Sequence, residues 1–253
     1  MANFQHLAIL KMGAIAWNEW RETYPQITPD LCGADLQGLN LSRVDLSQTL
    51  LIEANLSDGE LASANLYQAN LQTANLSRSN LSLSNLSGAI LTQGNLSHAN
   101  LIGANLSEAN LQEATCEETN LIGTDLRGAN LNGADLGGAK LHRSNLAFAS
   151  LIGVNLIAAQ LSEANFYEAE AIAAHFYQAD LYKANLTKAH LSGAYLLRAN
   201  LHQADLTQAD LRWTHLKGAN LTGANLRGAN LQWAKYLSSV QIASAIYGED
   251  AII

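Results

Sequence analysis

The sequence repeats with a strict period of five residues from Leu31 to Leu231. Of the 41 positions that this period marks, 37 hold leucine. The other four hold Cys116, Phe166, Ala171 and Phe176. No residue is inserted or lost in the run, so the phase holds from end to end, and few folds can accommodate it. We call each of these positions a centre.

The residues around each centre also repeat. The position two before the centre holds alanine in 28 of the 40 repeats from Ala34 to Ala229, and the position one before it holds asparagine or aspartate in 28 of 40. The two positions after the centre are mostly polar or glycine. One repeat therefore reads alanine, asparagine or aspartate, leucine, and two variable residues.

Neither a helix nor a flat strand can carry this pattern. Five residues at roughly 100° each turn the centre by about 140°, so the leucines would spiral around every side of a helix. In a strand the side chains alternate with period two, so successive centres would fall on opposite faces. A chain that turns one corner per repeat keeps every centre inside, and such tandem repetition is typical of a solenoid.

The residue types suit a corner in every repeat. Asparagine and aspartate hydrogen-bond nearby backbone and favour turns. Glycine fills the second position after the centre in 13 repeats, where we expect an unusual φ angle. The period alone leaves open the number of corners per coil and the handedness.

The repeat resembles the A(D/N)LXX unit of the pentapeptide-repeat family. This resemblance covers about four-fifths of the chain. It implies an all-β solenoid, namely a right-handed quadrilateral parallel β-helix in which four repeats form each coil. The run would then make about ten coils and a rod roughly 48 Å long, at about 4.8 Å per coil.

The solenoid predicts three segments: an N-terminal capping helix (1–29), the β-helix (30–235) and a C-terminal capping helix with a tail (236–253). Residues 3–24 have helical spacing, with Asn3 as a candidate N-cap, and the only two prolines, Pro25 and Pro29, close the segment. Because a solenoid exposes an apolar cross-section at each end, this helix is expected to cover the first coil. The run from Trp17 to Arg21 (WNEWR) resembles the leader helix of cyanobacterial family members.

At the other end, Ser238 or Ser239 is a candidate N-cap for a short helix that continues through Ile246 and ends at Gly248. The apolar tail 251–253 must pack or fray.

The side chains at three successive centres in the core are large, small and large, at Phe166, Ala171 and Phe176. This order predicts volume compensation rather than a ligand cavity.

Composition narrows the function classes. The net charge is −8 and the pI is near 5.3, which argues against direct nucleic-acid binding. Residues 1–170 hold 7 Lys/Arg and 17 Asp/Glu, whereas residues 171–237 hold 7 and 3, so the last third is mildly basic. No signal peptide or membrane span is visible, which predicts a cytoplasmic protein without a membrane partner.

No catalytic, cofactor-binding or metal-binding residues stand out. The recurring glycines belong to the repeat and lack a phosphate-loop lysine. His175 and His215 share a column two coils apart, roughly 9.6 Å, which is too far for one zinc ion. We therefore expect no enzyme activity, no cofactor and no metal.

One outward surface breaks the polar pattern. If residues 20 apart stack, Ile157, Tyr177 and Leu197 share one column. The neighbouring column on the same wall replaces asparagine with rings. The two columns predict a partner surface that contains Ile157, His175, Tyr177, Tyr195, Leu197 and His215. Trp213 and Trp233 form a second stacked pair on the adjoining wall. This pair is expected either to pack under the C-terminal helix or to belong to the candidate partner surface.

The sequence favours a non-enzymatic interaction protein that presents a rigid rod to an unknown protein partner or to a second copy of itself. The family resemblance implies two alternatives. One is a DNA mimic that modulates DNA gyrase or another topoisomerase, which the acidic first two-thirds permits and the basic last third disfavours. The other is a regulatory protein in cyanobacterial signalling or development.

Overall fold

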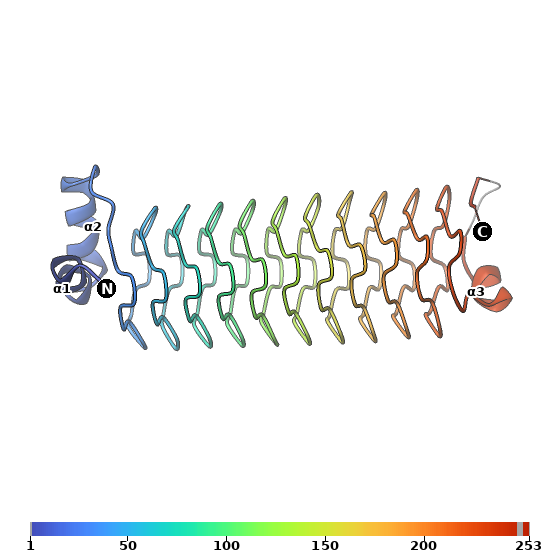
Figure 1. Cartoon of the computed structure of the whole chain (residues 1–253), viewed down its shortest axis with the longest axis horizontal. Coiled ribbons are helices and arrows are strands. Elements are labelled where there is room, and N and C mark those ends of the chain that lie inside the picture. The colour runs from blue at the N-terminus through green and yellow to red at the C-terminus, as the bar shows by residue number, and fades with distance from the viewer. Residues whose placement is uncertain (1, 247–249, 253) are drawn as a thin grey trace.

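The chain forms an elongated rod with helices at both ends (Figure 1). It was examined as a computed structural model that describes residues 2–246 and 250–252. The helices are α1 (Phe4–Lys11), α2 (Ala14–Thr23) and α3 (Ser239–Ser244). Between α2 and α3 the chain winds into stacked coils.

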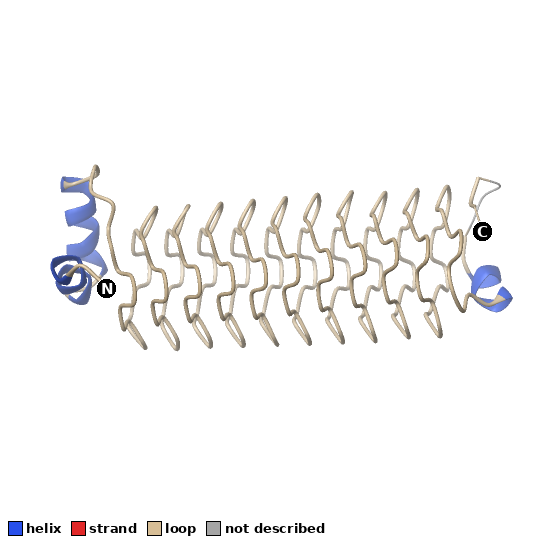
Figure 2. Ribbon diagram, viewed as in Figure 1, coloured by secondary structure: helices blue, strands red, loops and turns tan. Residues whose placement is uncertain are grey.

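The coils have four sides. Parallel bridges join residues 20 apart at every fifth position, from Asp30 paired with Leu50 to His215 paired with Lys235. Each coil thus contains four repeats, and the coils wind with a right hand, as the family resemblance implies. Each bridge involves a single residue per side, so the walls are drawn as loops in Figure 2.

The centres fill the interior of the rod. Every centre from Leu31 to Leu231 is buried, and so are the alanines two positions before it. Phe166 and Phe176 lie on opposite walls and meet edge to face, with ring centroids 6.2 Å apart. Ala171, between them in sequence, is fully buried. Two large side chains and one small one thus share this part of the core, in the large, small, large order on which the expectation of volume compensation rests.

One repeat shows why the fold needs these residue types. Asn105, Leu106 and Glu108 donate their backbone N–H groups to carbonyls of neighbouring coils. Ala109 donates its N–H to the carbonyl of Leu106 at 3.1 Å and closes the corner. The remaining N–H, of Ser107, is 3.0 Å from Oδ1 of Asn105. All five donors are satisfied, and the fifth requires an asparagine or aspartate before the centre.

The same asparagines also join the coils. Their Nδ2 atoms donate to the side-chain oxygen stacked 20 residues earlier, as from Asn75 to Asn55 at 3.3 Å and from Asn165 to Asn145 at 3.0 Å. Aspartate can only accept, and Asp135 lies below Asn155 and accepts its Nδ2 at 2.7 Å. The polar position therefore caps its own corner and bonds the next coil.

Each corner places its second residue at positive φ. This holds for every second residue after a centre, from Gly33 (φ 66°) to Trp233 (φ 61°), whether or not it is glycine. A positive φ in the third of four turn residues, closed by the hydrogen bond from the fourth residue to the first, characterises a type II turn. The expectation of unusual φ at the 13 glycines is confirmed, but the corner imposes it on every other residue type as well.

Two substitutions at corners measure the backbone strain that a positive φ causes. Replacing Gly193 (φ 69°) with alanine is expected to lower the free energy of unfolding by about 1 kcal/mol, although the new methyl group meets no atom within 4 Å. Replacing Ala158 (φ 56°) with glycine is expected to raise it by about 0.5 kcal/mol, since relief of strain outweighs the added chain entropy. Urea denaturation measures both, and changes of the same sign would contradict the argument.

The N-terminal cap differs from the single helix predicted for residues 3–24. Asn3 is the N-cap of α1, as expected, and accepts hydrogen bonds from two backbone N–H groups. The helix ends at Lys11, and α2 begins at Ala14, because Gly13 adopts φ 105° and redirects the chain. The helical spacing ran through this glycine, so the pattern alone did not reveal the break.

The first coil has no preceding coil to pair with its backbone groups. Side chains of α2 supply these hydrogen-bond partners instead. The indole N–H of Trp17 donates to the carbonyl of Asp45 at 2.7 Å, and the N–H of Asp45 donates to Oδ1 of Asn18 at 2.8 Å. Elsewhere in the rod a neighbouring coil supplies both partners. Arg21 adds a hydrogen bond to the carbonyl of Ser47 at 2.9 Å. The WNEWR segment therefore closes an open backbone edge with side chains.

The C-terminal end is closed by backbone pairing. Ser238 caps α3 with a capping box to Gln241, which confirms one of the two predicted caps. The helix ends at Ser244, earlier than predicted, because Ile246 leaves it to bridge with Asn225. Ile252 bridges with Asn230, so this residue of the tail continues the wall. Gly248 lies outside the described residues.

Across the part of the chain that the structure describes, no helix is long and apolar enough to cross a membrane.

Candidate interaction surface

One wall of the last coils carries a run of rings at the position that elsewhere mostly holds asparagine or aspartate. This wall has its centres at 156, 176, 196 and 216. The position before the centre holds His175, Tyr195 and His215, in line with Asn155 below them. The position after the centre holds Ile157, Tyr177 and Leu197, and then Lys217. We call this surface the aromatic wall, and it consists of Ile157, His175, Tyr177, Tyr195, Leu197 and His215.

The rings of the aromatic wall stack along the rod. The centroids of His175 and Tyr195 are 4.8 Å apart with planes inclined at 19°, and those of Tyr195 and His215 are 5.2 Å apart. The stack continues to Tyr236, whose centroid is 5.8 Å from that of His215. Because the bridges beneath hold consecutive rings one coil apart, stacking replaces the asparagine ladder and keeps the rings in place.

Beside this stack lies a hollow of about 450 Å³, lined by Tyr177, Leu197, Arg198, Lys217 and Gly218. The two wall residues Tyr177 and Leu197 are half-buried and supply its apolar surface, whereas Arg198 and Lys217 are exposed. The hollow thus combines apolar side chains with two cationic ones.

Trp213 and Trp233 stack at a corner near the aromatic wall, with centroids 4.6 Å apart and planes at 21°. The predicted stacking of this pair is confirmed. The expectation that the pair packs under the C-terminal helix is wrong, because the two side chains are 48% and 55% exposed. Helix α3 instead lies over the end of the core, where Nε2 of Gln241 donates to the carbonyls of Leu216 and Ala219.

Sequence reasoning missed two features of this surface. Tyr236 occupies the next five-residue position after Leu231, and its side chain is exposed rather than buried as a centre. The presence of tyrosine instead of leucine at this position was the sequence signal that the side chain lies outside the core. Arg198 follows Leu197 at a corner, and it borders the same hollow as Tyr177 because the coils stack.

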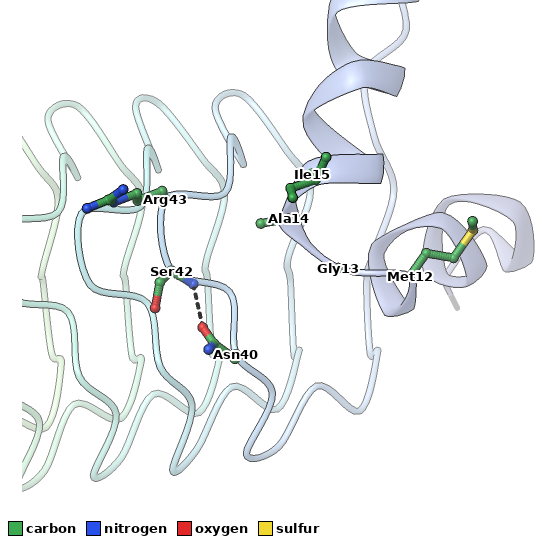
Figure 3. Close-up of a pocket in the computed structure, with 7 residues that line it drawn as sticks. All are labelled: Met12, Gly13, Ala14, Ile15, Asn40, Ser42 and Arg43. Atoms are coloured by element: carbon green, nitrogen blue, oxygen red, sulfur yellow. Dashed lines mark hydrogen bonds between the residues drawn. The ribbon is translucent and has the colours of Figure 1, made fainter.

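A second hollow of about 560 Å³ lies between the N-terminal cap and the first coils (Figure 3). It is lined by Met12, Gly13, Ala14 and Ile15 of the cap and by Asn40, Ser42 and Arg43 of the first coils. One of its polar side chains is already hydrogen-bonded within its own corner, because Oδ1 of Asn40 accepts the N–H of Ser42 at 3.1 Å. It lacks a nucleophile beside a base, so its residues do not support catalysis.

Groups with reactive chemistry are scattered. Within residues 2–246 and 250–252, no cluster of three histidine, cysteine, aspartate or glutamate side chains could hold a metal ion. Cys32 and Cys116 are both free thiols. Burial raises the pKa of the Cys116 thiol to about 12, so this cysteine stays protonated in the core and does not act as a nucleophile.

Two aspartates that pair with arginines have lowered pKa values. The hydrogen bonds from Arg127 hold the pKa of Asp125 below its usual value, and Arg212 does the same for Asp210. In both pairs the arginine comes two residues after the aspartate, so the pair closes over one corner. These pairs support turns and do not converge on a shared site.

The comparisons with known proteins agree with this geometry. The family model "Pentapeptide repeats" matches in 8 copies that together run from residue 30 to residue 235. A comparison with functionally curated proteins returns no significant match.

Two solved structures extend the likeness to the fold. HetL, a pentapeptide repeat protein involved in heterocyst differentiation regulation in the cyanobacterium Nostoc sp. strain PCC 7120, is 33% identical, with a TM-score of 0.74 over 85% of this chain and 96% of its own. QnrB1, a plasmid-mediated fluoroquinolone resistance protein, is 19% identical, with a TM-score of 0.54 over 73% and 88%. The latter likeness concerns the fold alone. From its repeats, its four-sided coils and these matches, the chain belongs to the pentapeptide-repeat family.

Proposed function

We propose that this protein is a non-enzymatic interaction protein that binds a protein partner through the aromatic wall. The observation that carries the proposal is the replacement of the polar ladder by stacked, partly exposed rings on one wall of an otherwise polar rod. Contiguous apolar patches with aromatic members are typical of protein interfaces. The wall is also held by the bridges beneath it, so binding requires little ordering of its side chains.

The double substitution Tyr177→Ser with Leu197→Ser tests the proposal. It is expected to weaken partner binding on the order of 100-fold, which corresponds to about 2.8 kcal/mol for two interface anchors. Folding should be preserved, because both side chains point outward from the coils. The measurement is capture of the partner from the native cell, followed by affinity measurement with the purified partner.

The chain offers a matched control on other walls. Tyr67 and Leu83 are 41% and 68% exposed, and replacing both with serine removes the same chemical groups elsewhere. This control should bind the partner as the unchanged protein does. Equal binding by all three proteins, with circular dichroism showing them folded, would exclude the aromatic wall, and the Trp213–Trp233 pair would become the next candidate.

The identity of the captured partner also separates the finer roles. The likeness to HetL supports a part in regulation, which a partner from a signalling or developmental system would favour. A topoisomerase partner would instead favour DNA mimicry. The uninterrupted coils and the basic residues at 171–237 support the regulatory role over the mimic.

A further inference from the structure

The hollow beside the ring stack carries positive charge that nearby carboxylates do not neutralise. In the described residues, Arg198 and Lys217 form no ion pair with a carboxylate, although other cations of the rod do, such as Lys188 with Glu168 at 3.0 Å. Nζ of Lys217 instead lies 6.0 Å from the ring centroid of Tyr236. Among the described residues, the two cations therefore border the hollow without a carboxylate partner.

The carboxylates of residues 171–237 are already engaged. Asp180 accepts the N–H of Tyr182 at 3.2 Å and Nδ2 of Asn200 at 2.8 Å. Asp205 is bonded in the same way by its own corner and the next coil. Asp210 pairs with Arg212 at 2.6 Å. The surplus of cations over carboxylates in this region is thus a feature of the surface.

We infer that the aromatic wall binds an acidic, apolar segment of a partner protein, an inference that rests on the proposed function. An apolar side chain of the segment enters the hollow against Tyr177 and Leu197, and its carboxylates contact Arg198 and Lys217. The guanidinium group can bond a carboxylate with two parallel hydrogen bonds, which favours carboxylate recognition in particular. Like charge excludes basic segments from the same place.

Short peptides with the full-length protein test this chemistry. The probe is a fluorescein-labelled peptide of sequence Glu-Leu-Asp-Phe-Glu-Leu-Asp-Glu, and its binding is measured by fluorescence anisotropy. One comparison peptide replaces the acids with their amides, and another replaces leucine and phenylalanine with serine. Each change is expected to weaken binding at least about tenfold, because charge and apolar contact both contribute. Raising the salt from about 0.05 M to 0.5 M should weaken the acidic probe and spare its amide form.

Charge reversal locates the site. Arg198→Glu with Lys217→Glu is expected to weaken probe binding at least about tenfold. The control, Lys140→Glu with Arg227→Glu, changes the net charge equally on other walls and should stay within about twofold. Glutamate is tolerated at corners with positive φ, as Glu53 (φ 57°) shows, so the variant at residue 198 should fold.

The outcomes separate this inference from the proposed function. If Tyr177→Ser with Leu197→Ser abolishes capture of the native partner while the charge reversal at residues 198 and 217 preserves it, the wall binds proteins but not through acidic groups. If both variants retain the partner, both proposals fail. Equal binding of the acidic and amide peptides, binding only to vesicles that contain phosphatidylserine, or self-association through the wall in light scattering would each overturn the inference.

Discussion

Replacing Trp17 with alanine is expected to lower the free energy of unfolding by about 3–5 kcal/mol. The side chain is fully buried where α2 covers the first coils, and its N–H satisfies the carbonyl of Asp45 at 2.7 Å. The substitution therefore removes a large apolar group, leaves a cavity and frees a carbonyl at the open edge of the β-helix. Urea denaturation followed by circular dichroism measures the change.

The same residue type at the other end provides the control. Trp233 is 55% exposed and stacks on Trp213, so its replacement by alanine should cost about 1 kcal/mol or less. Trp17→Phe keeps most of the apolar surface but removes the N–H donor, and it should cost about 1–3 kcal/mol. Unchanged stability of Trp17→Ala would mean that the helices do not cap the rod.

Replacing Leu136 with alanine is expected to cost about 2–5 kcal/mol. Leu136 is a fully buried centre in the middle of the rod, and the coils on both sides are held by bridges at every wall. The backbone therefore cannot collapse into the space left by the missing methyl groups, which places the expected cost well above that of an exposed leucine.

Leu83 is the matched control for this core substitution. It is 68% exposed at a corner, and alanine can adopt the same backbone conformation there, as Ala158 does. Leu83→Ala should change the free energy of unfolding by less than about 0.5 kcal/mol. A loss as large as that of Leu136→Ala would show that outward and inward positions contribute equally, against the observed fold.

Much of the rod was predictable because the period is a local property. One bend per repeat follows from five residues with one inward leucine, and the structure buries every centre, including Cys116 and Phe166. The corner glycines, such as Gly193, indicated positive φ for the same reason. The candidate surface was partly predictable too, since stacking of His175 and Tyr195 follows once residues 20 apart are adjacent.

The ends were less predictable because they depend on contacts between elements. Helical spacing continues through Gly13, yet the chain bends there so that α2 can place Trp17 against the first coils. At the other end, Ile246 continues an apolar helical pattern but bridges with Asn225, since the last coil offers unpaired backbone groups. Exposure of Trp213 likewise depends on where α3 packs.

The repeat, its inward positions and its corners follow from the amino-acid sequence alone, because each of these is set within five consecutive residues by sterics and local hydrogen bonds. The assembled coils, in contrast, set how α2 substitutes for a missing coil and which side chains meet on the aromatic wall. Trp17 reaches Asp45, and Arg198 borders the hollow that contains Tyr177. These contacts join residues about one coil or more apart, so they exist only after four sides close each coil and the coils stack.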